Sequence, residues 1–153
     1  MTLPTRLSLA TALLISGCGS ALAAQAPKAA LAVTSTSLLK TTTTWNGAPI
    51  TYSKSGSPEI QSVVVEIPAG SATAWHLHPV NNIAYVLEGK VRLELENGTT
   101  KSFSAGESFA EVVNTWHRGT NLGEGPLRIL VIYLGEVGTP LSAAKAGVAP
   151  GKH

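Results

Sequence analysis

Residues 70–89 read GSATAWHLHPVNNIAYVLEG, and this stretch combines a strand pattern with a pair of histidines. His76 and His78 are separated by one residue. Alternate side chains of a β-strand point to the same face about 6.5 Å apart, so both imidazoles can reach one ion. A third histidine, His117, follows about 40 residues later, which leaves room for hairpins that return the chain to the first pair. We predict that His76, His78 and His117 form a metal site.

The simpler alternative is that the two neighbouring histidines are partly exposed, or form a hydrogen-bonded pair in the core. The chain has only four histidines, and the fourth, His153, is the C-terminal residue, outside this arrangement. Three imidazoles on one face leave coordination positions open, as catalytic and ligand-binding metal sites do and closed structural sites do not. We therefore favour an open metal site and do not assign His153 to it.

The remaining sequence has the pattern of an all-β domain. Apolar, β-branched or alternating segments end at turn residues, and they cover residues 61–67, 83–87, 90–96, 108–113 and 127–134. Val91, Leu93 and Leu95 alternate with charged residues, so we expect them to face the core. Asn97-Gly98 is typical of a tight hairpin turn in which both residues are left-handed. The spacing predicts a closed or sandwiched barrel without a helix of three turns.

The glycine and histidine spacing resembles that of the cupin superfamily. The first cupin motif is matched by Gly70, His76, His78, Asn82 and Gly89, with Asn82 where the family usually has a metal-binding glutamate. The resemblance extends over about residues 57–135. It implies a small, single-domain, type-2-like cupin, which is a jelly-roll β-barrel.

The second cupin motif is matched more loosely. Gly106, Glu107, His117 and Asn121 keep its spacing, but Val112 stands where a proline is usual. The superfamily includes dioxygenases, isomerases, decarboxylases, sensors and storage proteins, so the resemblance implies a fold and no single activity.

Asn82 changes the expected charge of the metal site. Three neutral imidazoles leave the full charge on a divalent ion, whereas a glutamate ligand would cancel one unit, so we expect anionic ligands to be favoured. The resemblance points the same way, because three-histidine iron cupins such as cysteine dioxygenase and diketone-cleaving dioxygenase coordinate an anionic substrate. Asn82 is a candidate weak fourth ligand, or a hydrogen-bonding partner of bound water. The alternative is that metal affinity was lost with the glutamate.

Glu111 is the candidate catalytic acid–base residue. All nine acidic residues are glutamates, so any carboxylate chemistry must use one of them. Glu111 lies on the segment that leads into His117, and a side chain pointing into the barrel could exchange a proton with a substrate. The alternative is an exposed carboxylate at the barrel rim. We expect Arg118 to face away from the site and Asn121 to fix the turn after His117.

The N-terminus predicts export. Residues 1–17 contain Arg6 followed by an apolar run too short to span a bilayer, as in a signal peptide. Residues 15–18 read ISGC, which resembles a bacterial lipobox and implies that Cys18 is diacylated and becomes the mature N-terminus. The alternative is ordinary cleavage after Ala23 or the next alanine. The expected location is the periplasm, or the outer membrane as a lipoprotein.

Four segments are expected: a signal peptide at 1–17, a flexible tether at 18–44, the cupin barrel at 45–141 and a loose tail at 142–153. A single cysteine allows no intrachain disulfide, and a formal net charge of +2 argues against nucleic-acid binding. The expected partner is a small-molecule substrate, with membrane contact only through Cys18. Trp75 and Trp116 are expected to pack, although an exposed Trp75 would favour a homodimer face.

Three functional hypotheses follow. The first is a divalent-metal-dependent small-molecule enzyme of the oxygenase type that acts on an anionic substrate. Imidazole ligands do not distinguish Fe, Mn, Ni, Cu and Zn, so the metal stays open. The second is a non-catalytic module that binds or senses a small molecule or a metal. The third is a metal-free barrel with a structural or partner-binding role.

Overall fold

The computed structural model describes residues 35–52 and 56–147. The predicted signal peptide, Cys18 and the first part of the tether lie outside these residues, as does His153. Within the described ranges the chain forms nine strands and no helix. No segment in this part of the chain is therefore a helix of the length and apolarity that crossing a membrane requires.

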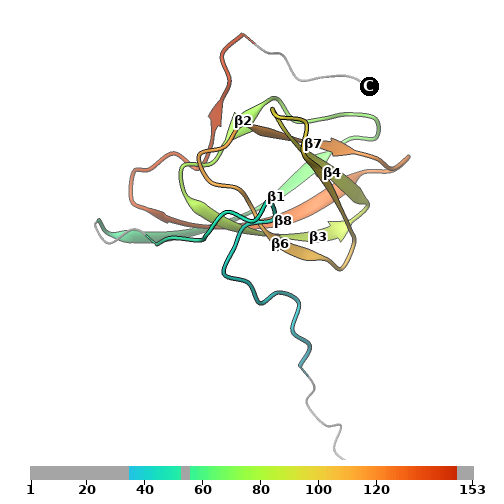
Figure 1. The fold of residues 1–153 in the computed structure, drawn as a ribbon. Helices are drawn as coiled ribbons and strands as arrows, with labels where there is room; N and C mark the ends of the chain where they lie inside the picture. The colour runs from blue at the N-terminus through green and yellow to red at the C-terminus, as the bar shows by residue number, and fades with distance from the viewer. Residues whose placement is uncertain (1–34, 53–55, 148–153) are drawn as a thin grey trace, which may run out of the picture. The chain divides into compact units, whose positions relative to one another are not determined.

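The strands form two antiparallel sheets that face each other (Figure 1). The four-stranded sheet has the order β1 (Pro58–Ile67), β8 (Leu127–Glu136), β3 (Asn81–Glu88) and β6 (Ser108–Ala110). The five-stranded sheet has the order β5 (Thr100–Ser104), β4 (Lys90–Leu95), β7 (His117–Asn121), β2 (His76–Leu77) and β9 (Ala143–Ala144). This arrangement confirms the predicted all-β architecture.

The core lies between the two sheets. Val86 on β3, Val91 on β4 and Leu127 on β8 are 0% exposed, so both sheets contribute to it. Phe103 and Phe109 stack with their ring centroids 4.0 Å apart. The alternation predicted along β4 is confirmed, because Val91, Leu93 and Leu95 are all buried. Burial of these side chains removes apolar surface from water and is the main stabilising term of a domain without disulfides.

The turn between β4 and β5 differs from the prediction. Gly98 has a φ of 83°, but Asn97 is not left-handed. The amide of Gly98 donates to the carbonyl of Leu95 at 2.9 Å, and the amide of Leu95 donates to the carbonyl of Thr99 at 2.9 Å. These bonds describe a three-residue loop, in which an ordinary turn precedes one left-handed glycine. The prediction that both residues are left-handed was wrong. An Asn-Gly pair also fits a three-residue loop, in which only the glycine is left-handed.

The glycines of the two sequence motifs occupy turns that favour glycine. Gly70, Gly89 and Gly106 have φ angles of 66°, 84° and 89°. At Gly89, which joins β3 directly to β4, an added Cβ would also lie 3.1 Å from the carbonyl oxygen of Pro126. A side chain there would be both strained and crowded. The motif glycines therefore set the chain reversals that bring the histidine segments together.

The ends of the barrel contain pairing that the sequence did not predict. A strand was expected over residues 108–113, but β6 ends at Ala110. The amide of Trp45 donates a hydrogen bond to the carbonyl of Ala110 at 2.9 Å. β5 was not predicted, because Phe103 is its only buried residue. Residues 143–144, placed in the expected tail, form β9 and pair with β2. Ordered pairing thus continues beyond the predicted end of the barrel at residue 141.

Candidate metal and ligand site

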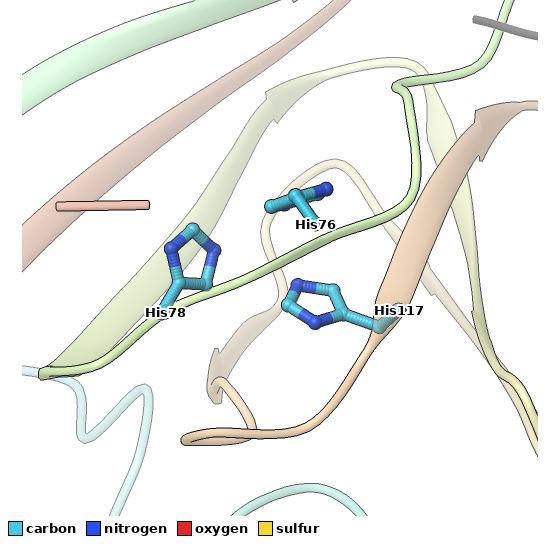
Figure 2. A group of neighbouring side chains, drawn as sticks. All are labelled: His76, His78 and His117. Atoms are coloured by element: carbon cyan, nitrogen blue, oxygen red, sulfur yellow. The ribbon is translucent and has the colours of Figure 1, made fainter. Parts of the chain in front are cut away.

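Three histidines meet inside the barrel. His76 on β2 is paired directly with His117 on β7, and His78 follows the end of β2. The ring centroids lie 4.3 Å apart for His76 and His117, 5.0 Å for His76 and His78, and 5.1 Å for His78 and His117. Figure 2 shows the three rings turned toward one another. The predicted convergence of the two histidine segments is confirmed.

Each histidine ring is held by a backbone carbonyl. The Nδ1 atoms of His76, His78 and His117 lie 2.8 Å from the carbonyl oxygens of Ala74, Leu141 and Thr115, respectively. A carbonyl oxygen only accepts, so each Nδ1 carries the hydrogen and donates it. The Nε2 atom of each neutral ring then keeps its lone pair for a ligand bond. Such carbonyl partners are the usual way in which proteins orient metal-binding imidazoles.

Burial keeps the three imidazoles neutral. It lowers the pKa of His78 from 6.5 to about 4, and desolvation is the largest cause. Desolvation also lowers the pKa of His76 and of His117, and the neighbouring His117 adds to the shift at His76. Neutral imidazole is the form that binds metals. At neutral pH the site therefore requires no deprotonation before an ion binds.

The three side chains fit a divalent ion. One ligand nitrogen from each of His76, His78 and His117 lies within 4.8 Å of the others, so small side-chain movements bring all three to metal-binding distance. The all-imidazole set suits zinc, copper, iron and nickel. With three protein ligands, such an ion would keep positions open for a substrate or water.

Glu111 points into the barrel and is not a rim carboxylate. Its Oε1 accepts hydrogen bonds from the indole Nε1 of Trp45 at 2.5 Å and from the amide of Val112 at 2.9 Å. Its Oε2 lies 3.9 Å from Nε2 of His117, beyond hydrogen-bond distance. Burial raises the pKa of Glu111 to about 7, which the two hydrogen bonds partly oppose. A carboxyl with this pKa can hold or release a proton near neutral pH.

Asn82 lies in the same cavity but makes no side-chain hydrogen bond. It is 2% exposed, and neither Nδ2 nor Oδ1 has a partner. Its side chain lies on the inward face of β3 with those of Ala84 and Val86, and it is paired in register with Tyr133 on β8. Asn82 lines the cavity, and its role as a weak fourth ligand or a partner of bound water stays a prediction.

Two residues near the site were not predicted. Trp45 reaches Glu111 across 66 positions of sequence, and a single tryptophan after a threonine run gives no signal of that contact. Tyr133 packs edge-on to His78, with ring centroids 5.4 Å apart. Burial raises the pKa of the Tyr133 hydroxyl, and the charge of Glu111 adds to the effect. Only the inward alternation along β8 could have indicated this tyrosine.

The other candidate residues lie outside the cavity, as expected. Arg118 pairs with Glu94 at 2.9 Å and lies 5.1 Å from the ring centre of Trp75, so both residues belong to the outer surface. Asn121 fixes the turn after β7. Its Nδ2 donates to the carbonyls of Ile67 and Gly125 at 2.9 and 2.8 Å, and its Oδ1 accepts from the amide of Gly123 at 2.8 Å.

The cavity around the histidines, here called the metal cavity, has a volume of about 70 Å³. His76, His78, His117, Asn82, Glu111 and Tyr133 form its polar side, and apolar residues of both sheets form the rest. Pockets for drug-sized ligands are several times larger, at roughly 300 Å³ or more. The metal cavity therefore has room for an ion and a ligand of few atoms.

Comparison with known proteins finds solved structures that resemble part of this chain. The chain is similar to Bacillus subtilis oxalate decarboxylase, a protein with Mn(II) centres, at 23% identity and a TM-score of 0.48, over 56% of this chain and 23% of that one. It is also similar to a DMSP lyase at 22% identity and a TM-score of 0.49, over 56% of this chain and 44% of that one.

The chain therefore spans less than half the length of either protein. No curated protein matches the sequence. Residues 63–133, however, match the model of the cupin domain family. This range contains all three histidines together with Asn82, Glu111 and Tyr133, and the two facing sheets agree with the match. Residues 63–133 are therefore similar to cupin domains, and the chain has an all-β cupin fold.

Proposed function

We propose that this protein is a metal-dependent enzyme of the oxygenase type that binds one divalent ion through His76, His78 and His117 and acts on a small anionic substrate. The observation that supports the proposal best is the orientation of the three rings. Each Nδ1 is committed to a backbone carbonyl, which leaves three Nε2 lone pairs for one ion. A bound divalent ion would supply Lewis acidity and, if redox-active, the capacity to activate oxygen.

The charge of the ligand set favours an anionic substrate. All three imidazoles are neutral at pH 7, so no ligand reduces the positive charge of the ion. The position that usually carries a glutamate in this family is Asn82, which is uncharged. A carboxylate, thiolate or enolate would supply the missing negative charge. The cavity of about 70 Å³ limits this substrate to a few atoms inside the barrel.

Glu111 is the proposed acid–base residue. The amide of Val112 and the indole of Trp45 hold one of its oxygens, so the other remains free on the side of His117. Because burial raises its pKa to about 7, both protonation states are populated at neutral pH. Glu111 can therefore take a proton from a substrate that enters the cavity and return it later in the reaction.

The proposal is tested by oxygen consumption. Protein loaded with Fe(II) is mixed with small carboxylates, thiolates and 1,3-diketones, and oxygen uptake is followed with an electrode. We expect uptake with at least one class, a loss of uptake in His117→Ala, and a reduction of about 100-fold or more in Glu111→Gln. Anion binding to the metal without oxygen uptake would favour a non-catalytic binding module and contradict the oxygenase.

We also propose that the protein is exported and attached to a membrane through Cys18. The basis is the sequence of residues 1–18, with a short apolar run followed by ISGC. Mass spectrometry of the mature protein tests the proposal. We expect an acylated N-terminal cysteine in the wild type and none in Cys18→Ser. An unmodified N-terminus after Ala23 or the next alanine would instead indicate a soluble periplasmic protein.

A further inference from the structure

Asn82 is buried with unsatisfied hydrogen-bonding groups. In residues 35–52 and 56–147, four buried side-chain atoms lack a hydrogen-bond partner, and two of them are Nδ2 and Oδ1 of Asn82. The others belong to Arg92 and Thr120, neither of which lines the metal cavity. An unpaired buried amide costs roughly 1–3 kcal/mol, and buried polar groups are nearly always paired in native proteins. A partner for Asn82 is therefore expected inside the metal cavity.

No neighbouring side chain supplies a partner for the Asn82 amide, although Oε2 of Glu111 remains free. The Nδ1 atoms of the three histidines donate to backbone carbonyls, and Oε1 of Glu111 accepts two hydrogen bonds. The backbone carbonyl of Asn82 accepts from the amide of Glu111 at 3.1 Å, which fixes the main chain but not the side chain. The partner of the Asn82 amide is thus most simply a molecule that enters the cavity.

The chemistry of the amide narrows the class of this molecule. A carboxamide both donates, through Nδ2, and accepts, through Oδ1. A hydroxyl group can complement either atom, whereas a plain alkyl group complements neither. The hydroxyl must lie close to the anionic group, because the cavity of about 70 Å³ holds few atoms. The smallest compounds with both features are 2-hydroxy acids.

We propose that Asn82 determines substrate specificity by forming a hydrogen bond to a hydroxyl group next to the metal-binding carboxylate, so that the substrate is a small 2-hydroxy acid. This inference rests on the proposed function, because it takes the carboxylate to the metal. Tyr133 lies opposite Asn82 across β3 and β8 and closes the same side of the cavity.

The test compares glycolate with acetate, which differ by one hydroxyl group. Both affinities are measured by titration of the Co(II)-loaded protein, with the visible spectrum of cobalt as the signal. Glycolate can chelate cobalt without help from the protein, so the ratio of the two affinities is compared between variants. We expect Asn82→Leu, which is close in size and apolar, to lower the glycolate-to-acetate ratio about tenfold.

Asn81→Leu is the matched control. Asn81 is the neighbouring residue of the same type on β3, and its side chain donates to the carbonyl of Thr51 outside the metal cavity. Its substitution is expected to leave the ratio unchanged. Asn82→Ala, which adds no bulk, provides the same comparison if the leucine variant does not fold.

Two results would overturn the inference. An equal ratio in the wild type and both Asn82 variants would show that Asn82 pairs only with water, while acetate binding to cobalt would still agree with the proposed function. If acetate, glycolate and azide all fail to perturb the cobalt spectrum of the wild type, the proposed anion site fails as well.

Discussion

Two asparagines of this protein are buried almost equally but have opposite environments. Asn121 is 3% exposed and makes three hydrogen bonds that fix the turn after β7, whereas Asn82 is 2% exposed and makes none through its side chain. Burial alone therefore does not distinguish a structural residue from a functional one. The difference lies in whether the fold satisfies the polar groups that it buries.

The largest expected difference between the two asparagines is in stability. Asn121→Ala removes three hydrogen bonds and leaves backbone groups unpaired, so we expect it to lower the free energy of unfolding by about 3 kcal/mol. Asn82→Ala loses no hydrogen bond, and we expect a loss below about 1 kcal/mol in the metal-free protein. Urea unfolding of both variants measures the two values. Equal losses would contradict the assignment of different roles.

Acid is expected to destabilise the metal-free protein at the histidines. The pKa of His78 is about 4 in the folded protein and 6.5 as its reference value. Below pH 6.5 the unfolded chain gains a proton at His78 that the folded chain does not gain until about pH 4, so acid favours unfolding. From pH 6.5 to 4 we expect His78 to contribute a loss on the order of 2 kcal/mol.

The control for this pH dependence is His78→Gln. Glu111 acts in the opposite direction, because its raised pKa makes the folded state gain stability as the pH falls from about 7 toward 4.5. The difference between wild type and His78→Gln, measured by urea unfolding at each pH, isolates the histidine. Parallel pH profiles for the two proteins would show that His78 is not a neutral, buried imidazole.

An intermediate effect is expected when Asn82 becomes charged. Asn82→Asp keeps the size of the side chain but adds a negative charge in the metal cavity. We expect metal to bind more tightly and azide to bind the Co(II)-loaded protein about tenfold more weakly, because the carboxylate reduces the net charge that attracts anions. Spectroscopic titration measures both. An unchanged azide affinity would place Asn82 too far from the ion to influence its ligands.

The smallest effect is expected at Trp45. Trp45→Phe keeps an aromatic ring but removes the indole donor from Oε1 of Glu111, and we expect a loss of stability of about 1 kcal/mol. Trp116→Phe is the comparison, since the Nζ atom of Lys145 lies 5.7 Å from the centroid of the Trp116 ring. Thermal unfolding measures both variants. Equal effects would show that Trp45 contributes only packing.

The sequence predicted the features that depend on short-range patterns. Alternation along β4 predicted that Val91, Leu93 and Leu95 are buried, and spacing predicted that the histidines converge. The direction of Arg118 and the turn fixed by Asn121 followed from strand periodicity and local side-chain hydrogen bonding. Each of these properties is set by neighbours within a few residues or by a motif of fixed spacing.

The remaining features depend on contacts that are distant in sequence. The orientation of Glu111 depends on Trp45, 66 residues away, and β9 forms only because β2 offers it an edge. The absence of a hydrogen-bond partner for the Asn82 side chain is likewise a property of the folded cavity. A sequence does not reveal which polar groups surround a side chain or which hydrogen bonds they make. These distant contacts determine the environments of Glu111 and Asn82, whereas short sequence patterns indicate which residues line the site.

Metal binding tests the account most directly. Metal-free protein is titrated with Co(II) or Zn(II) in the presence of a competing chelator, for the wild type and for the His76→Ala, His78→Ala and His117→Ala variants. We predict one ion per wild-type chain and an affinity at least about 100-fold lower in each variant. A wild type that binds no ion, or variants that bind as tightly as the wild type, would contradict it.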